Sequence, residues 1–238
     1  MKVVREHDKF YLHEDFKSKP KEYFKFLGEK NTTFFKKCPQ ARILDIGCAG
    51  GNFLYYLSRI CPKATLFGLE IRPDLLKKAK RSVPDAVFFQ GDITKTKTLK
   101  AIPKMDLVFM NGVHTIFDDL KWLKNSLSLL APGGKLCVFS FFNPEDLDVL
   151  VKVRHSGARA HDPWESGWNI FSKKTVAGYL ESTGAKFCFT DWQMPLDLAK
   201  NQKDPLRSWT VKLGDGSRQV VSGIQFIQHF SLLEITPR

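Results

Sequence analysis

The sequence lacks the defining features of several large protein classes. No apolar run approaches the roughly 18 residues that a membrane-spanning helix needs. The five cysteines are odd in number, widely spaced and without a C-x-x-C pair, so we expect free thiols, with neither a disulfide framework nor a metal site. The first residues are charged and lack the apolar stretch of a signal peptide, which predicts a cytoplasmic protein with no membrane partner.

Acidic residues are too few to balance the basic ones. The chain has 37 Lys and Arg against 25 Asp and Glu, which gives a net charge of +12. Such an excess can attract nucleic acid or anionic substrates. The basic residues are spread along the chain, however, and are not interleaved with aromatics as in an RNA-binding segment. We therefore favour a solvated basic surface over a nucleic-acid footprint.

What the sequence does contain is a strand, a glycine-rich turn and a helix in succession, within RILDIGCAGGNF at residues 42–53. Ile43, Leu44 and Ile46 form a short apolar run typical of a buried strand. Residues 47–51 are poor in side chains, and apolar residues then recur at helical spacing. A turn of this kind places backbone N–H groups and a helix N-terminus where an anionic ligand group can approach.

Strands and helices alternate from this point to residue 191. This alternation predicts an α/β fold with a mostly parallel sheet between two layers of helices. The predicted strands are Arg42–Ile46, Thr65–Leu69, Val87–Gln90, Leu107–Met110, Lys135–Phe141, Lys186–Asp191 and Phe226–Ile235. The predicted helices are Asn52–Ser58, Pro73–Ser82, Asp118–Leu130 and Lys173–Ser182, and a hairpin is expected within TVKLGDGSRQVV.

The glycine turn does not fit two common nucleotide motifs. Starting from Gly47, the second and third glycines of G-x-G-x-x-G are replaced by Ala49 and Asn52, which disfavours a dinucleotide pyrophosphate. No Gly-Lys-Ser/Thr follows the turn, so it is not a P-loop.

Two carboxylates end the next two strands in register with Asp45. Glu70 follows strand two, where a carboxylate can accept hydrogen bonds from both ribose hydroxyls. Asp92 follows strand three and is placed to accept from an adenine amino group, with Ile93 against the ring; a turn aspartate is the alternative. Asn111 and Gly112 end strand four beside strand one, at the switch point where ligands bind in such sheets.

Together, LDIGCAGG, LFGLEI, FFQGDI, MDLVFMNGVH and LLAPGGKLCVFSFF resemble the class I S-adenosylmethionine-dependent methyltransferase family over residues 42–142. The resemblance implies a three-layer αβα, Rossmann-like fold whose seven-stranded sheet has an antiparallel last strand. It also implies S-adenosyl-L-methionine as cofactor, with Glu70 on the ribose and Asp92 and Ile93 on the adenine. The methionine part would lie among Asp45, Gly47, Ala49 and Gly51. The remaining cofactor-binding candidates are Cys48, Ile71, Asn111 and Gly112.

Two insertions and the N-terminal segment lie outside the regular alternation. Residues 1–40 are expected to form a helical cap on a methyltransferase domain at 41–238. Residues 143–170 and 193–223 are lid-like insertions, and we expect them to build the substrate side, although surface elaboration is an equal alternative.

The acceptor of the methyl group is the least determined part of the site. His114 follows strand four and is the candidate for proton removal, with helix capping as the alternative. Substrate contacts are expected from Tyr11, Trp164, Trp168 and Arg207, against the alternatives of core packing for the aromatics and simple solvation for the arginine.

These observations predict a methyltransferase that transfers a methyl group to an O or N nucleophile of a small molecule by in-line displacement. Alignment and exclusion of water carry most of such a reaction, so a general base is optional. The alternatives are a methyltransferase acting on RNA or protein, and a non-catalytic cofactor-binding partner subunit. The oligomeric state is left open.

Overall fold

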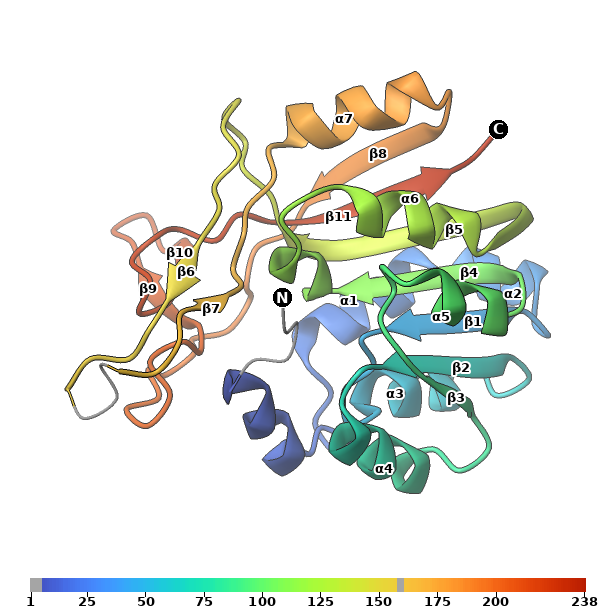
Figure 1. The fold of residues 1–238 in the computed structure, drawn as a ribbon, viewed down its shortest axis with the longest axis horizontal. Helices are drawn as coiled ribbons and strands as arrows, with labels where there is room; N and C mark the ends of the chain where they lie inside the picture. The colour runs from blue at the N-terminus through green and yellow to red at the C-terminus, as the bar shows by residue number, and fades with distance from the viewer. Residues whose placement is uncertain (1–5, 158–160) are drawn as a thin grey trace.

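The computed structural model describes residues 6–157 and 161–238, and its centre is a seven-stranded sheet (Figure 1). The strand order is β3-β2-β1-β4-β5-β11-β8. The first five are parallel to one another, and β11 is antiparallel to both β5 and β8. The strands are β1 (Arg42–Ile46), β2 (Thr65–Glu70), β3 (Val87–Gln90), β4 (Met105–Asn111), β5 (Leu130–Phe141), β8 (Lys186–Asp191) and β11 (Phe230–Thr236). The predicted mostly parallel sheet with an antiparallel last strand is confirmed.

Helices cover both faces of the sheet. They are α1 (Glu22–Lys30), α2 (Thr32–Lys37), α3 (Asn52–Ile60), α4 (Pro73–Ser82), α5 (Thr96–Ala101), α6 (Lys121–Ser128) and α7 (Lys173–Ser182). One apolar core joins α1 and α3 to one face, and a second joins α6 and α7 to the other. The structure is therefore the three-layer αβα arrangement that the sequence predicts.

Strand β1 shows how the local sequence produces these two cores. Ile43 and Leu44 are both fully buried, but they belong to different cores because successive side chains of a strand point to opposite faces. Parallel strands that are covered on both faces carry apolar residues on both, which explains why Ile43, Leu44 and Ile46 are apolar without alternation.

Several element boundaries differ from the prediction. Helix α5 was not predicted because its sequence TKTLKA is short and has no apolar periodicity. Strand β5 begins at Leu130 rather than Lys135, since Leu130 pairs with Met105 of β4 before a register shift leads to the pairing of Lys135 with Leu107. Strand β11 begins at Phe230, four residues later than predicted, and α6 is shorter than the predicted 118–130.

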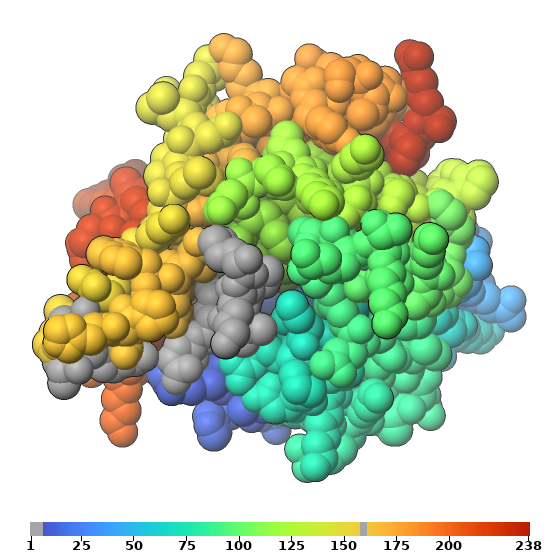
Figure 2. Space-filling view, in the orientation of Figure 1, coloured from blue at the N-terminus to red at the C-terminus, as the bar shows by residue number. Residues whose placement is uncertain are grey.

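The segments outside the regular alternation gather at the carboxyl ends of the parallel strands (Figure 1). They carry a 3-10 helix, η1 (Glu6–His13), and the short strands β6 (Lys152–Val153), β7 (Glu165–Ser166), β9 (Trp209–Lys212) and β10 (Arg218–Val221). In Figure 2 the yellow and orange-red atoms of these insertions lie on one side of the molecule. None of the helices in the described parts of the chain has the length and apolar character required to cross a membrane.

Candidate functional site

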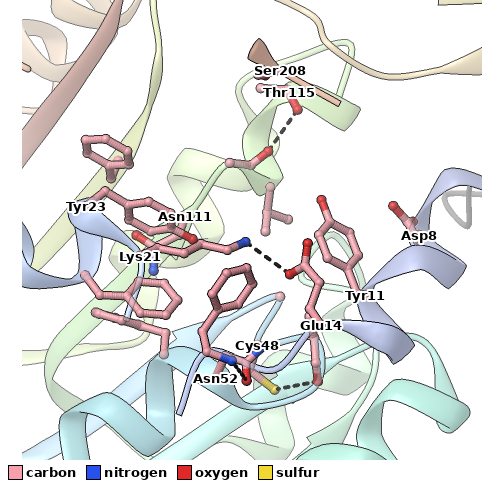
Figure 3. Close-up of a pocket in the computed structure, with 18 of the residues that line it drawn as sticks. Asp8, Tyr11, Glu14, Lys21, Tyr23, Cys48, Asn52, Asn111, Thr115 and Ser208 are labelled. Carbon is pink, nitrogen blue, oxygen red and sulfur yellow. Dashed lines mark hydrogen bonds and ion pairs between the residues drawn. The ribbon is translucent and has the colours of Figure 1, made fainter. Parts of the chain in front are cut away.

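A cavity of about 800 Å³ lies where the parallel strands end (Figure 3). The ends of β1, β2 and β4 form its floor, and the N-terminal segment and the later insertion form its walls. Ligands of open α/β sheets bind at this edge, where the strand order reverses. The volume is within the usual range of about 300–1,000 Å³ for small-molecule sites.

The glycine turn after β1 requires small residues at specific positions. Gly47 has a φ of +74°, and a Cβ on it would lie 2.3 Å from Val113 Cγ2. Ala49 also adopts a left-handed conformation, with a φ of +45°, which is uncommon for a residue with a side chain. Gly47, Cys48 and Ala49, which are predicted to bind the cofactor, line the cavity.

Gly51 has a different position from the one predicted. It precedes α3 with a φ of +83°, does not line the cavity, and a Cβ on it would lie 3.1 Å from Ala79 Cα. Its role is therefore close packing of α3 against α4. Asn52 begins α3, and its side chain accepts a hydrogen bond from the Phe16 backbone N–H at 3.4 Å.

Glu70 joins the turn to the end of β2. Its carboxylate accepts hydrogen bonds from the backbone N–H groups of Ala49, Ile71 and Arg72, each at 2.9 Å. Burial raises the pKa of Glu70, while these three N–H groups oppose the rise. A carboxylate has about four lone-pair sites, so capacity remains for a hydroxyl from the cavity.

Asp45 and Asn111 end neighbouring strands and meet at the cavity floor. Asn111 Nδ2 donates to Asp45 Oδ1 at 3.4 Å, and Asn111 Oδ1 is buried without a partner among the described residues. Asp45 is 3% exposed. Burial and the nearby charge of Glu70 raise its pKa well above the usual range. The pair is thus a buried acceptor site to which the structure supplies too few donors.

The other predicted cofactor residues also line the cavity: Ile71, Asp92, Ile93 and Gly112. Asp92 Oδ1 accepts from the backbone N–H and the hydroxyl of Thr94, both at 2.8 Å, so Asp92 also fills the turn role considered as its alternative. Cys48 is buried, and burial together with Asp45 and Glu70 raises its thiol pKa well above the usual range. Cys48 is therefore a neutral wall of the cavity.

Lys78 fastens the N-terminal segment over this floor. Its Nζ, on α4, donates to the carbonyl oxygens of Tyr11 at 3.2 Å, Leu12 at 3.0 Å and Glu14. These contacts hold η1 and Tyr11 against the cavity, where the sequence predicted Tyr11 to lie.

A chain of ion pairs joins the N-terminal segment to the later insertion. Glu14 accepts from Lys21 Nζ at 3.1 Å and from the Arg207 guanidinium at 2.7 Å, and Arg207 Nε also donates to Asp204 at 3.2 Å. Burial alone would raise the pKa of Glu14, but Lys21 and Arg207 outweigh it and the pKa is lowered. The sequence predicted Arg207 in the site but missed Glu14 and Lys21, because nothing local connects residues 193 positions apart.

His114 is not in the cavity, and its predicted role in proton removal is wrong. The residue is the second of the short 3-10 turn η2 (Val113–Ile116), and its side chain lies in the core. It is fully buried between the rings of Trp122 and Phe142, and neither ring nitrogen has a partner among the described residues. Burial lowers its pKa to about 3.

The two predicted tryptophans have different environments. Trp168 is 7% exposed and lines the cavity, so a substrate contact from Trp168 stays a prediction. Trp164 is 59% exposed, lies away from the cavity and stacks on the Arg154 guanidinium at 4.7 Å, so a substrate contact from Trp164 is contradicted. Trp192 also lines the cavity.

Comparison with known proteins identifies the family. A family model described as a methyltransferase domain matches residues 38–201. Trans-aconitate 2-methyltransferase from Methylobacterium nodulans is 34% identical over 149 residues, which are 57% of this chain and 54% of that protein. A methyltransferase from Aquifex aeolicus, described as S-adenosylmethionine-dependent, superposes with a TM-score of 0.55 at 16% identity, covering 98% of this chain and 99% of that one. YcgJ from Bacillus subtilis superposes with a TM-score of 0.58 at 14% identity, covering 88% and 98%.

The chain therefore belongs to the class I S-adenosylmethionine-dependent methyltransferase family. The matches to curated relatives span about half of those proteins' length. Much of the wall opposite the glycine turn comes from residues 206–230, which lie beyond the matched domain. The match thus covers the cofactor floor but not the whole acceptor wall.

The residues at the floor fit the family's cofactor. The methionine part of S-adenosylmethionine carries an ammonium group with three N–H donors, and Asp45 with the unpartnered Asn111 Oδ1 supplies acceptors for it. The residual acceptor capacity of Glu70 suits ribose hydroxyls. The glycine turn gives the close backbone approach that such a ligand requires.

Proposed function

We propose that this protein transfers the methyl group of S-adenosylmethionine to an oxygen or nitrogen of a small molecule. The observation that carries this proposal is the buried Asp45–Asn111 pair beside Glu70, which provides acceptors for an ammonium group and for ribose hydroxyls within one cavity. Membership of the methyltransferase family supports the same function. The names of the curated relatives give trans-aconitate as their substrate, and trans-aconitate is a small molecule like the acceptor proposed here.

When bound, the cofactor would supply a methyl group that is already activated by its attachment to a sulfonium. The chain's own residues bind and orient. Asp45 and Asn111 hold the ammonium end, Glu70 holds the ribose, and Asp92 and Ile93 receive the adenine. The N-terminal segment, fastened by Lys78, covers the site and keeps water from the reacting atoms.

A small acceptor is favoured over RNA by the charge of the cavity. Among the described residues, eight carboxylates and three Lys or Arg side chains line it, although the whole chain carries +12. The basic excess therefore lies elsewhere, and an anionic polymer gains nothing at the methyl site. The space beside the cofactor floor also counts against a non-catalytic subunit, since such a protein needs no acceptor room.

Isothermal titration with S-adenosylhomocysteine, the product form of the cofactor, tests the proposal. We expect saturable binding with one ligand per chain. A matched titration with 5′-methylthioadenosine, which lacks the amino-acid part, should give weaker binding because Asp45 and Asn111 lose their ligand. Absence of any binding of S-adenosylhomocysteine would overturn the proposed function.

A further inference from the structure

The acceptor half of the cavity has walls that are mainly apolar and aromatic. Its side chains come from the two insertions and the end of β5, and they include Phe141, Trp168, Trp192, Met194, Leu196 and Leu206. Flat aromatic walls of this kind stabilise ring-bearing ligands by burial and by ring contacts. The surface therefore suits a molecule that is mostly apolar.

Two of the three cations that line the cavity in the described part of the chain are paired with carboxylates, and the third, Lys19, is exposed to solvent. Lys21 pairs with Glu14, and Arg207 pairs with both Glu14 and Asp204. The carboxylates of these pairs are buried, with side-chain exposures of 2% for Asp204 and 9% for Glu14, whereas Arg207 is 33% exposed. An anionic acceptor would have to displace a buried carboxylate, and separating a buried ion pair is costly. A ligand with several carboxylates is the least suited to this wall.

Gln228 places a side-chain amide on the wall of this half of the cavity. Gln228 is 4% exposed, and its backbone N–H donates to the Val220 carbonyl at 2.8 Å. Its side-chain Oε1 accepts from the Ser208 hydroxyl at 2.7 Å. This bond fixes the orientation of the amide, and no residue in the described part of the chain accepts from its Nε2. This N–H donor is accessible from the cavity, so a ligand oxygen can accept a hydrogen bond from it.

We infer that the methyl acceptor is an uncharged, ring-bearing molecule, held by an oxygen that accepts a hydrogen bond from Gln228 Nε2. Ser208 sets the amide orientation, Trp168 and Trp192 flank the ring, and the ion pairs around Glu14 exclude polycarboxylates. This inference rests on the proposed function and names the substrate class of the same site. It separates this chain from its curated relatives, whose named substrate is a tricarboxylate. Gln228 and Ser208 lie beyond the matched domain, which is consistent with a different acceptor.

The experiment compares two probes on the protein saturated with S-adenosylhomocysteine. The probes are 2-naphthol, a neutral ring compound with one oxygen, and trans-aconitate, and binding is followed by titration calorimetry and by quenching of tryptophan fluorescence. We expect 2-naphthol to bind more tightly than trans-aconitate. The variant Gln228→Leu should weaken 2-naphthol about tenfold, the usual effect of losing one hydrogen bond in a buried site.

Matched variants separate recognition from folding. Gln219→Leu, on β10 and away from the cavity, should leave both affinities unchanged. Ser208→Ala keeps the Gln228 amide but removes the hydrogen bond that orients it, so we expect a smaller loss of affinity for 2-naphthol. This variant replaces Gln228→Leu in the test if circular dichroism shows that Gln228→Leu does not fold. S-Adenosylhomocysteine affinity should stay constant in all three variants.

The outcomes are distinguishable. If S-adenosylhomocysteine binds but 2-naphthol does not, if trans-aconitate binds more tightly, or if the Gln228 and Ser208 variants leave 2-naphthol affinity unchanged, the inference is overturned and the proposed function stands. If S-adenosylhomocysteine itself does not bind, the proposed function fails and the inference fails with it.

Discussion

Asn111 donates its amide to Asp45 at 3.4 Å and leaves its own carbonyl oxygen buried without a partner. The two residues end adjacent strands, and each destabilises the protein when no ligand is bound. Asp45 has a buried carboxyl group whose pKa is raised well above the usual range, and Asn111 has a buried acceptor without a donor. A ligand ammonium relieves both. The floor of the cavity is therefore destabilised for the sake of binding, a pattern common at functional sites.

The first prediction concerns Asp45. A folded-state pKa above the unfolded value means that the stability contributed by protonated Asp45 is present at low pH and is lost as pH rises through the folded pKa. Asp45→Asn should therefore raise the melting temperature at neutral pH. It should also lower the affinity for S-adenosylhomocysteine by about tenfold or more. Calorimetric melting and titration measure both, with the exposed Asp85→Asn as control.

In wild type the affinity for S-adenosylhomocysteine should rise with pH up to the raised pKa of Asp45, because the ionised carboxylate binds the ammonium. An Asp45→Asn variant that kept both the affinity and its pH dependence would contradict this assignment.

The second prediction concerns Glu70. Glu70→Gln keeps the size of the side chain but replaces one acceptor oxygen by a donor facing the N–H groups of Ala49, Ile71 and Arg72. We expect weaker binding of both S-adenosylhomocysteine and 5′-methylthioadenosine, by about tenfold or more, and a loss of stability on the order of 1–3 kcal/mol. Titration and urea unfolding check these effects against Glu29→Gln, an exposed position. Unchanged binding of 5′-methylthioadenosine would remove Glu70 from the ribose site.

The third prediction concerns the strained Ala49. Ala49 has a φ of +45°, so Ala49→Gly removes the steric cost of a Cβ in the left-handed region. The greater freedom of glycine in the unfolded chain partly offsets this gain, and we expect the substitution to stabilise the turn by about 1 kcal/mol. Cofactor affinity should be kept or improved. A marked loss of stability on urea unfolding would show that the Ala49 methyl group packs usefully.

The fourth prediction concerns Lys78, which binds carbonyl oxygens of the N-terminal segment. Lys78→Met should increase amide hydrogen exchange in residues 6–16 and weaken S-adenosylhomocysteine by a few fold, since the cover over the site is released. Lys77→Met, one residue earlier and exposed, is the control. Equal exchange in both variants would mean that other contacts hold η1.

The fifth prediction concerns His114. Its folded-state pKa of about 3 lies below the usual 6.5, so its contribution to stability is present above pH 6.5 and is lost as pH falls toward 3. His114→Phe removes two unsatisfied nitrogens from a core of aromatic rings and should flatten the fall in stability between pH 7 and about pH 5. S-Adenosylhomocysteine affinity should not change. A variant that lost methyl transfer but kept cofactor binding would restore the catalytic role we have rejected.

The cofactor side could be predicted from the sequence because its signals are local. Each strand end carries its own polar residue, so Asp45, Glu70 and Asp92 can each be recognised from the strand that precedes it. Parallel strands bring the three residues to one edge of the sheet. The acceptor side could not be predicted from the sequence, since Glu14 contacts Arg207 and Ser208 contacts Gln228 only in the folded chain. His114 shows a third limit: its position after β4 was correct, but one turn of 3-10 helix decides whether it faces the cavity or the core.

The most direct test of the account is calorimetric titration of wild type and Asp45→Asn with S-adenosylhomocysteine and with 5′-methylthioadenosine. If Asp45 and Asn111 hold the methionine end, wild type binds S-adenosylhomocysteine more tightly. The substitution should then remove that advantage while leaving 5′-methylthioadenosine unchanged. Equal affinities of wild type for the two ligands, or no binding of either, would contradict the central claim.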